Sequence, residues 1–477
     1  MERAVLGRRN NGRGLMGRVA TASVAAVVGV TALVVGTGVA PVGAAPTEDG
    51  PTAARYGAAW LATQLDAGIP MQNFGSPDWG VTLDGALGLV ASGTGGDQVD
   101  EVWAALVAGR DSAVTVGGVD SPGRIARAIM LAIVTGNDPR SVGTGPGSDL
   151  IARLESTMRA DGADAGLYGS SSPTYDGAFR QGYSIAALVA AGEAPDQLAI
   201  DWLASQQCDS GDDSGSWMPY RSDLAAPCAA DPSAFVGPDT NATAAGITAL
   251  AALGEQDGDA AAAALSWLDQ VQEADGGWAQ MAGYGTDPNS TALVLSSLIA
   301  VGQADSSRFA DRSRTPLAAL LSFQLGCEAP EADRGAFTFP GSNDAPNGFA
   351  TVQALGAAAG QPFVFEPGDV SAGVSPLDCT QATTTTTTTS STTTTPTTVA
   401  PSTTAAPSTT ATVTPVSAQV QGLSQGSDTA EAESASTASA PATLPRTGAD
   451  SSLLLVPGVA ALFGGAALVL VGRRRVV

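Results

Sequence analysis

The chain contains 477 residues and carries a formal net charge of −24 at pH 7. All 22 basic residues are arginine, because the sequence contains neither lysine nor histidine. These absences exclude a Ser-His-Asp triad, a Cys-His pair, a histidine metal site and a Schiff-base lysine. The acidic excess argues against a nucleic-acid partner, because nucleic-acid binding requires a basic surface.

Residues 1–45 are predicted to form a secretory signal. Five arginines between Arg3 and Arg18 supply a positive start, and residues 19–40 form an apolar run of small residues. Val42-Gly43-Ala44 then resembles a cleavage site. The alternative is a retained membrane anchor. Export would place the four cysteines in an oxidising environment.

Residues 51–379 are predicted to form an all-α repeat domain. In the clearest unit, residues 267–302, apolar residues recur at helical spacing up to Gln272. Asp275-Gly276-Gly277 ends that helix, and Trp278 follows as a large apolar group at the corner. Asp287-Pro288-Asn289 then opens a second helix. One such unit cannot bury its own apolar face, so we expect the units to stack.

Similar units recur along the chain. Their corner positions lie about 40 to 61 residues apart, which is roughly the period of a two-helix repeat array. The six predicted corner residues are Trp79, Val119, Tyr168, Trp217, Trp278 and Phe337.

The four cysteines predict two disulfides, for which three pairings are possible. Cys208 and Cys228 flank a Gly/Asp/Ser-rich insertion in the fourth repeat, so we favour a bond between them. Cys327–Cys379 would then tie the C-terminal edge of the domain to the sixth repeat. The alternative is a reactive thiol, including a thioester adhesin, although Cys327-Glu328 lacks the neighbouring glutamine.

The units resemble the α/α-toroid repeats of terpene cyclases, protein prenyltransferase β-subunits and the helical domain of cobalamin carriers. Leu268, Gln272, Gly276 and Trp278 match the spacing of the cyclase "QW" repeat, and the resemblance covers about residues 53–365. It implies an (α/α)6 toroid, a barrel of about six helical hairpins. In this fold the glutamine and the aromatic residue of each corner would hold neighbouring units together.

Cyclases of the squalene–hopene type carry an Asp-x-Asp-Asp-Thr-Ala motif that leads into an inner helix. Residues 239–244 and 287–292 match this motif, with Asn241 and Asn289 in place of the proton-donating middle aspartate. An amide has no transferable proton at useful pH, so we do not expect an alkene to be protonated here. We predict that these Asp and Asn side chains are helix caps, and that the protein uses no metal or other cofactor.

We expect an unidentified small-molecule or surface ligand to bind at the mouth of the barrel. The candidate ligand-binding residues are Trp79, Tyr168, Tyr175, Asp176 and Tyr220. Trp217 also offers a stacking surface, but core packing is favoured for Trp217 and Trp278. Residues 346–355 resemble the last toroid helix of cobalamin carriers, yet we expect no counterpart of the β-rich domain that closes over their ligand.

Two enzymatic alternatives remain open. In a surface hydrolase or lyase, Asp176 beside Tyr175 and Arg180, or else Asp84, would point into the mouth of the barrel. That alternative predicts two carboxylates about 5–9 Å apart in one cavity. A diverged cyclase would instead need another acid at the depth of the two asparagines.

Residues 380–443 are rich in Thr, Ser, Pro and Ala and nearly free of large apolar residues. Such a segment cannot bury enough surface to fold, so we predict a disordered stalk. In an extended conformation it could reach on the order of 150–200 Å.

Residues 444–477 combine a pentapeptide, an apolar span over residues 453–471 and the basic tail Arg473-Arg474-Arg475. The pentapeptide is Leu444-Pro445-Arg446-Thr447-Gly448. The apolar span is nearly long enough to cross a bilayer as a transmembrane helix, and the arginines would stay on the cytoplasmic side.

This order resembles the sorting signal of sortase substrates on Gram-positive cells. It implies a membrane-bound stage, cleavage between Thr447 and Gly448, and covalent transfer of Thr447 to peptidoglycan by sortase. The alternative is an ordinary single-pass anchor. The sequence therefore predicts a secreted, wall-anchored and non-catalytic toroid that acts as a ligand-binding or adhesive module.

Overall fold

The computed structural model describes residues 49–169, 176–231 and 236–380. Every described residue belongs to one compact unit, which lies within Pro41–Val477. The predicted signal and sorting signal, the predicted stalk apart from Thr380, and Tyr175 lie outside the described residues.

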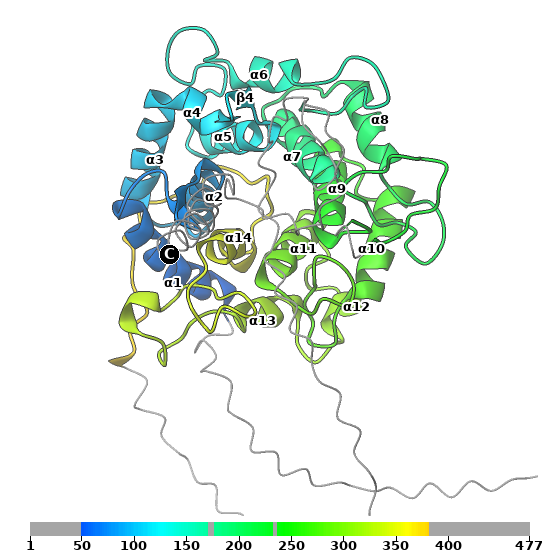
Figure 1. The fold of residues 1–477 in the computed structure, drawn as a ribbon. Helices are drawn as coiled ribbons and strands as arrows, with labels where there is room; N and C mark the ends of the chain where they lie inside the picture. Colours follow the sequence, from blue (N-terminus) through cyan, green and yellow to red (C-terminus); the bar gives the residue numbers. More distant parts are fainter. Residues whose placement is uncertain (1–48, 170–175, 232–235, 381–477) are drawn as a thin grey trace, which may run out of the picture. The chain divides into compact units, whose positions relative to one another are not determined.

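The helices alternate along the chain between an outer and an inner layer (Figure 1). The outer layer contains α1 (Gly50–Asp66), α3 (Gly96–Ala108), α4 (Arg110–Val114), α6 (Leu150–Ser156), α8 (Gln197–Ser205), α10 (Asp259–Val271), α12 (Ser307–Ala310) and α13 (Pro316–Leu321). The inner layer contains α2 (Trp79–Ala91), α5 (Pro122–Val134), α7 (Gly177–Ala190), α9 (Thr240–Leu253), α11 (Pro288–Ala300) and α14 (Gly348–Ala358). Two antiparallel hairpins, β1 (Gln72–Asn73) with β2 (Ser76–Pro77) and β3 (Thr115–Val116) with β4 (Val119–Asp120), and the 3-10 helix η1 (Glu331–Asp333) complete the described elements.

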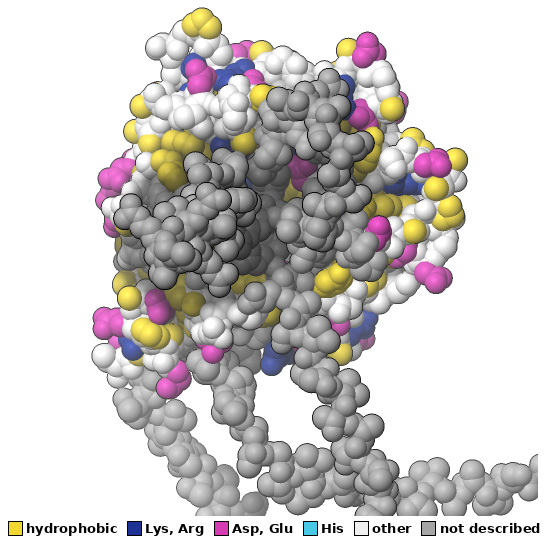
Figure 2. Space-filling model, viewed as in Figure 1, with side chains coloured by type: hydrophobic (Ala, Val, Ile, Leu, Met, Phe, Trp, Pro, Cys, Tyr) yellow, Lys and Arg dark blue, Asp and Glu magenta, His cyan; other side chains and the backbone are white. Residues whose placement is uncertain are grey.

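The two layers differ in how much of each helix is apolar. Inner helix α9 buries every residue from Thr240 to Ala249, whereas outer helix α3 buries only Val99, Val102 and Leu106. A helix that is apolar all round needs neighbours on every side, and a helix with one apolar stripe can cover such a layer from solvent. Acidic side chains are accordingly seen around the outer rim of the described ring (Figure 2).

The inner helices form a closed ring. They pack in the order α2, α5, α7, α9, α11 and α14, and α14 packs back against α2 (Figure 1). The outer helices pack on the ring from outside: α6 contacts α5, α8 contacts α7 and α10 contacts α9. This arrangement confirms the predicted all-α (α/α)6 toroid of six helical hairpins.

The predicted corner motif holds neighbouring units together through side-chain hydrogen bonds. Trp278 is fully buried, and its Nε1 donates to the carbonyl of Leu268 at 2.8 Å. Gln272 Nε2 donates to the carbonyl of Gly276 at 2.8 Å and to that of Phe309, in the next unit, at 3.0 Å. The corner backbone is also bonded to the inner helix, because the N–H of Trp278 donates to Thr291 Oγ1 at 3.0 Å.

The same glutamine contact closes the ring. Gln324 Nε2 donates to the carbonyl of Gly335 at 2.9 Å and to that of Ala53, in helix α1 of the first unit, at 2.7 Å. The corner residue of this unit, Phe337, is fully buried as predicted. This side chain therefore adds a direct hydrogen bond between the last unit and the first to the packing of α14 on α1 and α2.

Alanine in place of Gln324 is expected to lower the free energy of unfolding by about 1–3 kcal/mol, because two buried carbonyls lose their donor. Gln64, the matching residue of the first repeat, is the control: its Nε2 reaches only the hydroxyl of Thr63, at 3.2 Å near the surface. Gln64→Ala should change the free energy by less than about 0.5 kcal/mol. Urea denaturation of both variants measures the difference, and equal effects would contradict the role given to Gln324.

The corner positions predicted for the first two repeats are wrong. The N–H of the capping residue before the inner helix donates to the corner carbonyl: Asp287 to Trp278 at 3.0 Å, and likewise Asp78 to Met71 at 2.9 Å. In the second repeat Ser121 donates in this way to Val114, also at 2.9 Å. A short β-hairpin lies between corner and helix in these two repeats, and the insertion displaced the predicted positions to Trp79 and Val119.

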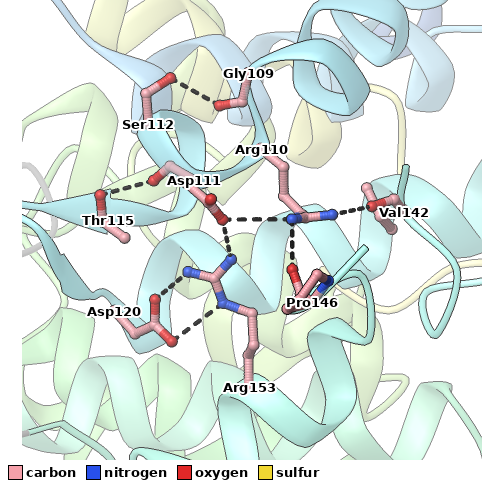
Figure 3. Close-up of polar contacts among 9 residues, drawn as sticks. All are labelled: Gly109, Arg110, Asp111, Ser112, Thr115, Asp120, Val142, Pro146 and Arg153. Carbon is pink, nitrogen blue, oxygen red and sulfur yellow. Dashed lines mark hydrogen bonds and ion pairs between the residues drawn. The ribbon is translucent and has the colours of Figure 1, made fainter. Parts of the chain in front are cut away.

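An arginine cluster joins the second and third units (Figure 3). Arg153, from α6, forms ion pairs with Asp111, at 2.6 Å, and with Asp120. Arg110, from α4, donates to the carbonyls of Val142, at 2.8 Å, and Pro146, at 2.9 Å. These bonds hold the glycine-rich loop before α6 against the ring.

The structure contains the two favoured disulfides, Cys208–Cys228 and Cys327–Cys379, so no cysteine is free. The reactive-thiol alternative is therefore wrong for this structure, because both pairs are already oxidised. The second bond joins the sixth unit to the end of the described chain.

Candidate functional site

A cavity of about 80 Å³ lies inside the ring of inner helices. Helices α2, α5, α7, α11 and α14 contribute to its walls, and residues 362–365, which follow α14, close one side. Protein interiors are normally packed with few voids larger than a water molecule. The ring therefore keeps a space that its side chains do not fill.

One wall of the cavity is aromatic. The ring of Tyr183, from α7, lies 4.7 Å from that of Phe179 and 4.3 Å from that of Phe363, measured between centroids. Burial raises the pKa of Tyr183 far above its usual range, so its hydroxyl stays neutral. Phe365 extends this wall.

A buried ion pair between Arg127 and Asp84 forms the charged part of the cavity wall. Arg127 Nε lies 2.5 Å from Asp84 Oδ1, and Arg127 Nη1 donates to the carbonyl of Gly123 at 2.6 Å. The guanidinium carbon lies 6.0 Å from the centroid of the Tyr183 ring, within range of a cation–π contact. Burial raises the pKa of Asp84, although the charge and hydrogen bond of Arg127 act in the opposite direction. The pair as a whole adds no net charge to the cavity.

One amide on the cavity wall, Gln353 of α14, contacts a second amide, Asn289 of α11, which does not line the cavity. Asn289 Nδ2 donates to Gln353 Oε1 at 2.7 Å, and Gln353 lines the cavity. Asn289 Oδ1 and Gln353 Nε2 have no hydrogen-bond partner among the described residues. Exchange of O and N in both amides would still leave one donor and one acceptor unused.

The prediction that Asn241 and Asn289 are helix caps is wrong. The capping oxygens belong to the aspartates before them: Asp239 Oδ1 accepts from the N–H of Ala242 at 2.9 Å, and Asp287 Oδ1 from that of Ser290 at 2.8 Å. The two asparagines occupy the second helical position, from which Asn289 turns toward Gln353.

The capping aspartates are buried ionisable groups. Burial raises the pKa of Asp239 to about 6, although hydrogen bonds from Gln280, Ala242 and Asn241 lower it. Burial also raises the pKa of Asp287 to about 6. Gln280 Nε2 donates to Asp239 Oδ2 at 2.7 Å, which links the start of α9 to the corner before α11.

These shifts predict a stability that falls as the pH rises. The folded-state pKa values of about 6 exceed the usual 3.8, so the folded chain holds more protons between these values. The stabilisation that these two carboxyls give the folded state is fully present below about pH 3.8 and is lost as the pH rises through about 6. Each carboxyl should make the protein about 1 kcal/mol more stable at pH 5 than at pH 7.

The variant Asp239→Asn/Asp287→Asn tests this expectation, because asparagine also caps helices but does not titrate. The free energy of unfolding, measured with denaturant, should differ less between pH 5 and pH 7 for the variant than for the wild type. Asp111→Asn, at an exposed residue, is the control and should leave the difference unchanged. An unchanged difference in the double variant would contradict the raised pKa values.

The structure places the predicted ligand-binding residues away from this cavity. Trp79 and Tyr168 belong to the hydrophobic core, with 9% and 1% of their surface exposed. Asp176 pairs with Arg180 at 3.1 Å at the start of α7, and Tyr220 is a partly exposed loop residue. None of these four residues lines the cavity.

Asp84, the alternative candidate, does line the cavity. It is the one carboxylate among the described lining residues, so the paired carboxylates of the hydrolase alternative are not brought together there. Four lining residues were not predicted from the sequence: Arg127, Tyr183, Gln353 and Phe363. A signal was available for Arg127, because it interrupts the apolar run of α5.

Two further observations bear on the site. Within the described ranges, no group of acidic and cysteine side chains is placed to hold a metal ion. Among the same residues, every helix is too short or too polar to cross a bilayer.

Outside the described ring, residues 436–477 match the model of the LPXTG cell wall anchor motif. This is a sortase-anchored cell-wall protein. It is secreted, sortase processes it, and it is covalently attached to peptidoglycan. The match covers the predicted sorting signal and the end of the predicted stalk.

Two solved structures are similar to the cell-wall protein in fold. A protein from Actinoplanes is 17% identical with a TM-score of 0.41, and the match covers 65% of this chain and 98% of that one. The ent-copalyl diphosphate synthase from Streptomyces platensis is 18% identical with a TM-score of 0.35, over 64% of this chain and 49% of the synthase. No curated protein matches the chain. Neither likeness is close enough to transfer an activity.

Proposed function

We propose that the helical ring is a ligand-binding module displayed on the cell wall, and that small neutral ligands bind in the cavity between its inner helices. The observation that carries this proposal is the cavity itself, of about 80 Å³ in a packed ring. Aromatic walls with a few placed polar groups are typical of small-molecule sites. The ligand should be neutral, because Asp84 and Arg127 neutralise each other.

The polar groups of the cavity favour binding over catalysis, because none of them is free to transfer a proton. Asp84 is held by Arg127 at 2.5 Å, so it is not free to transfer a proton. Asn289 and Gln353 are amides, which can orient a ligand through hydrogen bonds but cannot act as general acids. An aromatic ring that carries a carboxamide or hydroxyl group matches both the aromatic wall and the amides.

A cavity-filling variant tests the proposal. Gly356 lines the cavity, and a Cβ at this position would have no atom closer than 4.0 Å, the carbonyl oxygen of Gln361. Gly356→Leu should therefore fill the cavity without a backbone clash. Ligand-observed NMR on the full chain, with neutral aromatic compounds that include benzamide, should detect binding to the wild type but not to this variant.

Gly356→Ala is the matched control, because it adds one methyl group and should retain binding. It should also stabilise α14 by about 0.5–1 kcal/mol, since alanine is a better helix former than glycine. Binding that is equal in the wild type and in Gly356→Leu would place the ligand elsewhere. An absence of binding by every compound would contradict the proposal.

The domain arrangement belongs to this proposal. A signal at residues 1–45 would be removed, and sortase would cleave between Thr447 and Gly448. The Thr-rich segment of residues 380–443 would then act as a stalk that holds the ring away from the wall. Mass spectrometry of wall fragments should find peptidoglycan on Thr447, and Thr447→Ala should release the protein or leave it in the membrane fraction.

Adhesion is the second candidate, and one observation favours it. Phe74 lies at the tip of the β1–β2 hairpin with 50% of its surface exposed and a φ of +49°. A bulky residue in the left-handed region is strained, and such strain often occurs at functional sites. Phe74→Asn should keep or increase stability, and it should weaken cell adhesion if the tip is a contact.

A further inference from the structure

The chain that follows α14 runs from the cavity to the second disulfide. We name residues 361–379 the closing segment. Near its start, the ring of Phe363 lies 4.3 Å from that of Tyr183 on the cavity wall. Its last residue, Cys379, is bonded to Cys327 in the sixth unit.

Between these ends the closing segment is held by few bonds. It contains no helix, and its one bridge pairs Ala372 with Thr94, whose Oγ1 donates to the Ala372 carbonyl at 2.8 Å. Most of residues 366–376 are exposed. Segments with much exposure and few hydrogen bonds open at a low free energy. The closing segment could therefore leave the ring while the helices stay folded.

The disulfide changes how a pull from the cell wall reaches this segment. The chain after Cys379 leads to the wall attachment, so tension on the protein enters the described ring at this residue. Through the covalent bond, tension passes directly to Cys327. The chain between the two cysteines, which are 52 positions apart in the sequence, contains α14 and the closing segment and is bypassed.

We propose that Cys327–Cys379 is a latch that keeps the closing segment seated on the cavity under tension, and that a thiol reductant releases it. A dithiol would reduce the bond to two cysteine thiols, pass its two protons to their sulfurs and itself become a cyclic disulfide. After this step, tension pulls the closing segment outward and withdraws Phe363 from the wall. The latch thereby regulates access to the cavity.

The two disulfides should differ in their reaction with a reductant. Cys327 and Cys379 are both partly exposed, whereas in the other bond only Cys228 is partly exposed and Cys208 has 2% of its surface exposed. Thiol–disulfide exchange requires access to a sulfur atom. The latch offers a dithiol two accessible cysteines and Cys208–Cys228 offers one, so the latch should be reduced first and the other bond supplies an internal control.

Single-molecule pulling on the full chain, with handles at its two ends, tests the latch. Cys327→Ser/Cys379→Ser should show an early extension of roughly 60 Å before the ring unfolds, as expected for the closing segment at ~3.3 Å per residue. The wild type and Cys208→Ser/Cys228→Ser should lack this step. Folded wild type treated with dithiothreitol should gain it, which covers the case in which the variant does not fold.

Hydrogen exchange gives a second readout without tension. Amides of residues 361–379 should exchange at least about tenfold faster in the latch variant, while amides of the inner helices stay unchanged. An early extension in the wild type, or equal exchange in variant and wild type, would overturn the proposal. Only the claim that the latch controls access of a ligand rests on the proposed function. Pulling and hydrogen exchange are both measured without a ligand, so failure of the latch and failure of ligand binding are distinguishable.

Discussion

Alanine in place of Trp278 is expected to lower the free energy of unfolding by about 3–5 kcal/mol. The side chain is fully buried, and its ring lies 5.9 Å from that of Phe309 in the next unit. Truncation removes a large apolar contact and also leaves the carbonyl of Leu268 without its 2.8 Å donor. Both losses occur at a junction between two units, so the ring cannot relax locally to fill the space.

Trp103, on outer helix α3, is the control for this prediction because it is only partly buried and is not a corner residue. Trp103→Ala should lower the free energy of unfolding markedly less than Trp278→Ala does in the same urea denaturation experiment. The corner variant should keep the far-UV circular dichroism of a helical protein at low urea. Similar costs for the two variants would show that the corner is not a special junction.

Replacement of Arg127 by methionine is expected to cost about 3–5 kcal/mol, because it leaves the Asp84 carboxylate buried without its partner. Arg127 has 2% of its surface exposed, and its Nε lies 2.5 Å from Asp84 Oδ1. Burial already raises the pKa of Asp84. Without the guanidinium this pKa should rise further. The stability that Arg127→Met loses relative to the wild type should therefore be smaller at low pH.

A second substitution separates charge from packing. In Arg127→Met/Asp84→Asn no charge remains in the cavity, and most of the lost stability should return, since the main cost of the single variant is an unpaired charge. Arg140→Met is the control: that arginine pairs with Asp149 and Glu193 at the surface, so little change is expected. Urea denaturation at pH 7 and pH 5 measures all three variants. A double variant as unstable as Arg127→Met would mean that packing, not charge, dominates.

Local chemistry predicted much of this fold because several of its parts depend on residues close in sequence. The corner of residues 272–278 is one such part: a helix end, two glycines and an aromatic group specify a turn from nearby residues. The cap at Asp287 is another, since its oxygen bonds to an N–H three residues away. Repetition of this local unit then indicated a stacked array, and the pairing of Cys208 with Cys228 followed from their place around one insertion.

The corner residues Met71 and Val114 could not be predicted in the same way. Their role is defined by backbone bonds from Asp78 and Ser121 across an intervening hairpin, and a hairpin whose strands are two residues long leaves little trace in the apolar pattern. A search for aromatic residues therefore selected Trp79, which begins α2.

The sequence alone determined that the chain is built from helical hairpins, that its cysteines pair in two bonds and that it carries a wall-sorting signal. These properties depend on local spacing, on composition or on a linear motif. The tertiary structure decided which side chains line the cavity, for a physical reason. Inner helices such as α9 and α11 are buried almost all round, so their sequences contain no polar face from which a direction can be read. Only closure of the ring turns Asp84, Arg127 and Tyr183, from three different helices, toward one space.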